Sequence, residues 1–140
     1  AIAIGFSSPA ASLNINDIII KMAKEKLWSG EALGQNNEFI TAPPSGKTKA
    51  YGYIPNAQAK NVIKTGVTSG RAESCDLPWK THYHAMMNFL RKQNYNEHQT
   101  SYIGILHGAA QSLSASKPCQ KGEKPRIEQR INENLKTFNQ

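Results

Sequence analysis

The chain has few cysteines, no long apolar run and few acidic residues. Two cysteines among 140 residues, Cys75 and Cys119, exclude a scaffold built on several disulfides and allow one bridge or two free thiols. No apolar run approaches the roughly 20 residues of a membrane-spanning helix. Ten acidic residues oppose 17 basic ones, and the net charge of +7 favours anionic partners. The length fits a single domain, 1–140.

Four segments have the periodicity of amphipathic helices, and they predict a mainly α fold. They cover about residues 16–30, 78–90, 96–113 and 125–138. The third segment begins with Asn96 and Gln99, a pair that matches a capping box. In the same segment, Gly104 and Gly108 lie four residues apart, which predicts the close approach of another helix.

Residues 35–74 lack this periodicity. They contain three prolines and four glycines, and apolar residues are scattered among them. We therefore predict a long irregular basic excursion with a short hairpin around Tyr51, Tyr53 and Val62. The expected fold is a small four-helix bundle with this excursion and one disulfide.

The first twelve residues, AIAIGFSSPAAS, are apolar at the start and small at the end. This pattern is typical of the end of a signal peptide, although the basic n-region is missing. The alternative is an N-terminal arm that packs Ile2, Ile4 and Phe6 on the domain. Export predicts a secreted or periplasmic protein in which Cys75 and Cys119 form a disulfide.

Positive charge is concentrated in residues 47–72, which contain five basic residues and no acidic one. Lysines act as mobile charges on phosphates, and tyrosines suit the boundary between polar and apolar regions. Near an anionic membrane each basic residue contributes about 1 kcal/mol. The stretch therefore predicts a site for an anionic lipid or membrane surface. Its residues are Lys47, Lys49, Tyr51, Tyr53, Lys60, Lys64 and Arg71.

Catalytic and cofactor signatures are weak. Residues 46–48, Gly-Lys-Thr, lack the earlier glycine and the preceding strand of a phosphate-binding loop. His82 and His84 point to opposite sides of a helix, so they predict no metal site. We therefore expect that the protein is not an enzyme and uses no cofactor. We also expect no nucleic-acid partner, because no binding motif for RNA or DNA is present. The enzymatic alternative is a cysteine hydrolase with Cys75 as nucleophile and His107 as base, if the run before His107 is a strand.

In composition, this chain rich in Asn, Gln and Lys, with a signal-like start and one cysteine pair, resembles small exported bacterial proteins. These include secreted virulence effectors that act on host membranes, as well as periplasmic inhibitors and immunity proteins. The resemblance is compositional and transfers no catalytic residue. Together with the basic stretch it implies an exported, non-enzymatic effector that binds anionic lipid headgroups of the phosphoinositide kind. The alternative is a periplasmic inhibitor or immunity protein that binds a partner protein.

Overall fold

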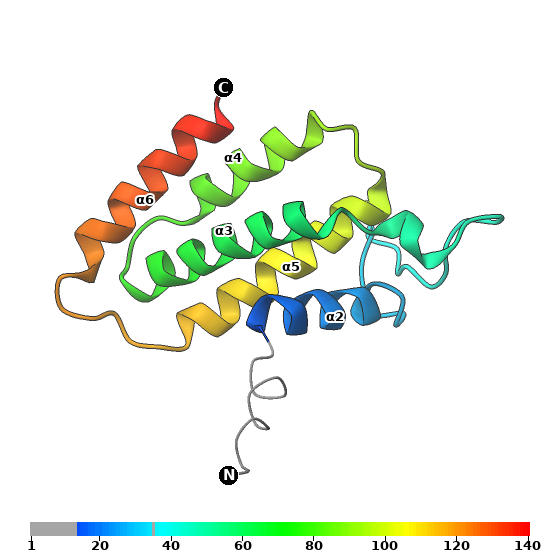
Figure 1. Cartoon of the computed structure of the whole chain (residues 1–140), viewed down its shortest axis with the longest axis horizontal. Coiled ribbons are helices and arrows are strands. Elements are labelled where there is room, and N and C mark those ends of the chain that lie inside the picture. The colour runs from blue at the N-terminus through cyan, green and yellow to red at the C-terminus, as the bar shows by residue number, and fades with distance from the viewer. Residues whose placement is uncertain (1–13, 35) are drawn as a thin grey trace, which may run out of the picture.

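The computed structural model describes residues 14–34 and 36–140, and this part of the chain is helical (Figure 1). The predicted signal remnant or arm at residues 1–12 lies outside the described residues. Besides one isolated bridge between Leu33 and Phe39, the described residues form no strand. The elements are α2 (Ile15–Leu27), η1 (Lys49–Gly52), α3 (Asn56–Ser74), α4 (Lys80–Arg91), α5 (Glu97–Ala115) and α6 (Glu123–Phe138).

The helices form three layers. The central pair, α3 and α5, packs along most of its length, with α2 on one side and α4 and α6 on the other (Figure 1). The main core lies where α2, α3, α4 and α5 meet, around Ile63, Tyr102 and Leu106. A smaller apolar cluster joins α3 to α6 through Ala72, Ile127 and Ile131.

The prediction that residues 35–74 form an irregular excursion was wrong for the second half of this stretch. Residues 56–74 form α3, a fifth helix at the centre of the domain. The buried face of α3 is made largely of small residues such as Ala59, Gly66 and Ala72, so its apolar periodicity is weak. Packing against α5, and not intrinsic propensity, stabilises this helix.

The first half of the stretch is irregular, as predicted, apart from η1. The predicted hairpin is absent, because Tyr51 lies in η1 and Val62 lies inside α3.

The other four helices match the sequence pattern closely. The capping box is confirmed: Asn96 Oδ1 accepts the backbone N–H of Gln99, and the Gln99 side chain accepts the backbone N–H of Asn96. The first helix is capped by Asn14, two residues before the predicted start. The last begins at Glu123, just ahead of Pro125.

Two glycines of α3 allow its backbone to approach α5 closely. A Cβ atom added at Gly66 would lie 2.6 Å from the carbonyl oxygen of His107 and 2.8 Å from Cβ of Ala110. A Cβ at Gly70 would overlap the carbonyl oxygen of Gln111 and lie 2.6 Å from Cβ of Ser114. Only glycine therefore fits at these two contact points.

The sequence pattern assigned this role to Gly104 and Gly108, and that prediction was wrong. A Cβ atom at either position meets nothing within 4 Å. The close contact is made by the glycines of the opposite helix, which the sequence pattern had placed in a loop.

The two glycine pairs give a matched test of this packing. Gly70→Ala should lower the free energy of unfolding by about 3 kcal/mol, because the added methyl group overpacks the contact between two backbones. Gly108→Ala adds the same methyl group in open space on a helix, and should raise stability by about 0.5–1 kcal/mol. Urea denaturation followed by circular dichroism measures both changes. Equal effects of the two substitutions would contradict the close approach of α3 and α5.

Candidate functional site

The seven residues predicted from the basic stretch are spread over the molecule and do not form one loop. Lys47 lies just before η1 and Lys49 lies in it, whereas Lys60 and Lys64 lie on α3. All four are exposed. The two tyrosines are half-buried, and each has a lysine over its ring. The Nζ atom of Lys47 lies 5.4 Å from the centre of the Tyr51 ring, and that of Lys24 lies 4.9 Å from the Tyr53 ring. These contacts add weak cation–π attraction.

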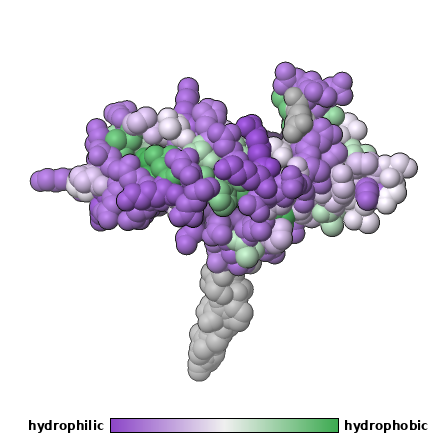
Figure 2. Space-filling view, turned by 90° about the horizontal axis from the view of Figure 1, so that it is seen from above, coloured by the Kyte–Doolittle hydropathy of each residue, from purple (hydrophilic) through white to green (hydrophobic). Residues whose placement is uncertain are grey.

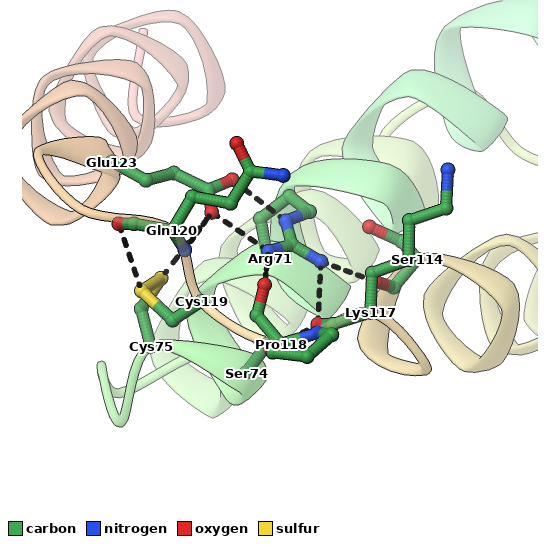
Figure 3. Close-up of a disulfide and its surroundings, with 9 residues drawn as sticks. All are labelled: Arg71, Ser74, Cys75, Ser114, Lys117, Pro118, Cys119, Gln120 and Glu123. Atoms are coloured by element: carbon green, nitrogen blue, oxygen red, sulfur yellow. Dashed lines mark hydrogen bonds and ion pairs between the residues drawn. A yellow bond between two sulfur atoms is a disulfide. The ribbon is translucent and has the colours of Figure 1, made fainter.

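Arg71 serves a different purpose. Its Nε and Nη2 atoms donate to the two carboxylate oxygens of Glu123, both at 2.7 Å (Figure 3). Its Nη1 and Nη2 atoms also donate to the carbonyl oxygens of Ser114, Lys117 and Pro118 at 2.6–3.0 Å. The guanidinium is thus committed to holding α3 against the connection between α5 and α6.

The charge on Glu123 is stabilised by this arrangement. The hydrogen bonds from Arg71, together with the backbone N–H of Gln120, lower the pKa of Glu123 to about 2. The same pairing raises the pKa of Arg71 above its ordinary value. The pair is therefore ionised throughout the physiological range.

The disulfide lies at the same junction. Cys75, which caps the end of α3, is bonded to Cys119 in the α5–α6 connection, as the sequence predicted (Figure 3). Both sulfur atoms and the Glu123 carboxylate lie within 4.8 Å of one another. Because both sulfurs are in the disulfide, neither offers the thiolate that a metal ion or a cysteine hydrolase needs. His107, the base of that hydrolase alternative, lies in helix α5 and not in a strand.

A groove of about 980 Å³ opens between α3, α4 and α6. Val62 and Ile63 of α3 and Met86 of α4 are buried beneath it. Seen from above the molecule of Figure 1, hydrophobic residues show as patches enclosed by hydrophilic ones (Figure 2). The apolar side chains that line the groove are Val62, Ile63, Val67, Met86, Phe89, Leu90 and Phe138.

The charged side chains that line this groove are both cationic. They are Lys64 of α3 and Arg130 of α6, and both are exposed. The remaining polar lining consists of neutral amides and hydroxyls, among them Asn61 and Thr137, and the hydroxyl of Tyr95. The groove therefore combines an apolar floor with a positively charged rim. Such a combination suits a ligand with an apolar body and an anionic end.

A buried chain of hydrogen bonds runs beneath the groove. Ser69 Oγ lies 3.0 Å from His82 Nδ1 and 3.0 Å from His107 Nε2. His82 Nε2 accepts from the amide of Asn134, at 2.9 Å, and Asn134 lines the groove. With Nε2 accepting, Nδ1 of His82 carries the proton and donates to Ser69 Oγ, which in turn donates to His107 Nε2.

Both histidines in this chain are neutral. Burial lowers the pKa of His82 to about 4, and burial together with the nearby His82 lowers the pKa of His107 to about 4. A serine hydroxyl next to a neutral imidazole has the geometry of a nucleophile and its base. The Ser69 side chain is fully buried, however, so no substrate reaches it. The chain of hydrogen bonds positions Asn134 in the groove wall.

Sequence reasoning missed this cluster because Ser69 was placed in a loop. A signal was present in the histidines. His82 lies four residues before Met86, and His107 lies four residues after Ile103, so both occupy the apolar sides of their helices. A polar residue on an apolar face needs a buried partner.

The described helices include none with both the length and the apolar character needed to cross a bilayer. Comparison of the chain with protein-family models, with curated proteins and with solved structures gives no match.

Proposed function

We propose that the protein is an exported, non-enzymatic binding protein whose partner is an anionic lipid, as in a secreted effector that acts on membranes. The observation that carries the proposal is the exposure of Lys47, Lys49, Lys60 and Lys64 in a stretch, residues 47–72, without any acidic residue. Within the described part of the chain, none of these four lysines is in an ion pair with a carboxylate, so their ammonium groups are available to phosphate or carboxylate groups of a headgroup. Arg71 is left out of the proposed site because its donors are already used by Glu123 and three carbonyl groups.

Sedimentation with anionic vesicles tests the proposal. Replacing the four lysines together with Gln should weaken binding by about a thousandfold, since four basic residues near an anionic surface contribute about 4 kcal/mol. Binding of the unaltered protein should also fall as salt is added, because exposed charges are screened over about 8 Å at physiological ionic strength.

The control removes the same amount of charge elsewhere. It replaces four exposed lysines outside the stretch, Lys21, Lys26, Lys121 and Lys136, with Gln. The control should keep most of the affinity. Equal losses in both variants would indicate non-specific attraction to the net charge and would contradict a site.

A second candidate, binding to a partner protein, is favoured by one feature of α2. Ile15, Ile18 and Met22 lie at positions i, i+3 and i+7 and are 54%, 47% and 42% exposed. They form an apolar stripe beside the buried face of the helix, as in a surface that another protein covers. If the vesicles fail to bind, this stripe becomes the better guide to the partner.

A further inference from the structure

From the groove between α3, α4 and α6 we infer that the ligand is a single-chain anionic amphiphile, such as a fatty acid or a lysolipid with an acidic head. This inference rests on the proposed lipid-binding function and names the class of lipid. The chain would lie on the apolar floor, and the anionic head would lie between Lys64 and Arg130. The protein would then enclose part of a lipid molecule, in addition to touching a membrane surface.

The size and shape of the groove support a small molecule with an apolar chain. Its volume of about 980 Å³ lies at the upper end of the range of roughly 300–1,000 Å³ for ligand sites. On α3 its lining extends from Gln58 to Thr68, which at 1.5 Å per residue is about 15 Å. An extended acyl chain matches this length, whereas a bare headgroup fills only one end.

The charges around the groove support an anionic head. Lys64 of α3 and Arg130 of α6 both line the groove, so a ligand that occupies it meets positive charge from two helices. Arginine binds a carboxylate or phosphate through two parallel hydrogen bonds, and lysine adds a mobile charge. Among the described residues that line the groove, none carries a carboxylate that could neutralise either cation.

The floor of the groove supports an apolar chain. Met86, Ile63 and Val62 are buried below it, and the half-buried rings of Phe89 and Phe138, 5.7 Å apart, form part of its wall. Methionine adapts to ligands of different shape because its side chain is unbranched and polarizable. Asn134 is the anchored polar group of the wall, since its amide is held by His82.

Titration calorimetry with three soluble probes tests the inference. Dodecanoate has a chain and a charge, dodecanol has the chain alone, and acetate has the charge alone. Dodecanoate should bind with one molecule per protein. Dodecanol should bind about tenfold or more weakly, because it lacks the charge-assisted contacts, and acetate should show no measurable binding.

Three variants place the ligand. Lys64→Gln combined with Arg130→Gln should weaken the binding of dodecanoate about tenfold or more, and should leave the binding of dodecanol unchanged. Asn61→Trp, at an exposed position of the groove lining, should block both probes while the core of the helix stays intact. The matched control, Lys21→Gln combined with Lys121→Gln, changes two exposed lysines outside both the groove and the proposed lysine site, and should leave dodecanoate binding unchanged.

The outcomes separate this inference from the proposed function. Binding to anionic vesicles without binding of dodecanoate would overturn the groove assignment and leave lipid-surface binding in place. Binding of dodecanoate without binding to vesicles would support the groove and overturn the membrane-surface proposal. If Asn61→Trp has no effect, or if the control loses as much affinity as the groove variant, the groove is not the site.

Discussion

Lowering the pH from 7 to 5 is expected to reduce the free energy of unfolding by about 4 kcal/mol. The effect comes from His82 and His107, which are buried, and whose pKa in the folded protein is lowered to about 4. In the unfolded chain both have the ordinary pKa of about 6.5. Between these two values the unfolded state binds more protons than the folded one, so stability is lost as the pH falls. Each histidine accounts for about 2 kcal/mol of the loss at pH 5.

The pH window separates this effect from that of the ion pair. Glu123 has its pKa lowered to about 2, so its contribution is present above the ordinary pKa and is lost only as the pH falls below about 4.5. Between pH 7 and pH 5 the buried histidines therefore dominate the change.

Urea denaturation at several pH values measures the effect, and two variants assign it. His82→Gln combined with His107→Gln should be less stable than the natural protein at pH 7 but should have a much flatter dependence on pH. His84 lies on the exposed side of α4, the helix that contains His82, and His84→Gln should leave the pH dependence of the stability unchanged. An unaltered protein that is equally stable at pH 5 and pH 7 would show that the two rings are not held neutral in the core.

Removal of the disulfide is expected to lower the free energy of unfolding by about as much as the change from pH 7 to pH 5. Cys75 and Cys119 are separated by 44 residues, and closing a loop of that length stabilises a protein by about 4 kcal/mol in the chain-entropy model. For a domain of this size that loss should lower Tm by roughly 12 °C. The variant in which Ser replaces both cysteines, compared with the natural protein by thermal circular dichroism, measures the difference.

The Arg71–Glu123 pair should keep the fold intact when the disulfide is removed. Because Arg71 also ties the end of α3 to the α5–α6 connection, the serine variant should keep its helical spectrum at low temperature. Reductant should destabilise the natural protein and have no further effect on the variant. Two reactive thiols in the unfolded, unreduced protein would contradict the bridge itself.

The fold was predictable from the sequence wherever large apolar residues mark the buried face. The capping box at Asn96 and the helix that follows it have local signals, and the single cysteine pair predicted the disulfide; the structure confirms all three. The helix α3 has no such signal, because glycine, serine and threonine occupy much of its buried face. Their stabilising contacts are made with residues of α5 about 40 positions later in the chain, and a local pattern carries no information about them.

Contacts between residues far apart in the chain also explain why only part of the candidate site could be predicted from the sequence. Exposed lysines were recognisable one by one, since charge is a property of single residues. Their distribution was not, because it depends on a helix that the pattern did not predict. The groove needs α3, α4 and α6 together, and Arg130 gained its place on the rim only through the packing of α6.

The glycine contacts between α3 and α5 also limit how this sequence can change over time. Gly66 and Gly70 touch main-chain atoms of α5, so shortening a facing side chain frees too little room for a larger residue at either position. Such a change would need α5 itself to move, and α5 also contacts α2 and η1. The two positions should therefore stay fixed while exposed residues of the same helix outside the proposed sites, such as Asn56 and Ala57, vary freely. In any set of related chains, two invariant glycines four residues apart would identify the central helix more reliably than its hydropathy does.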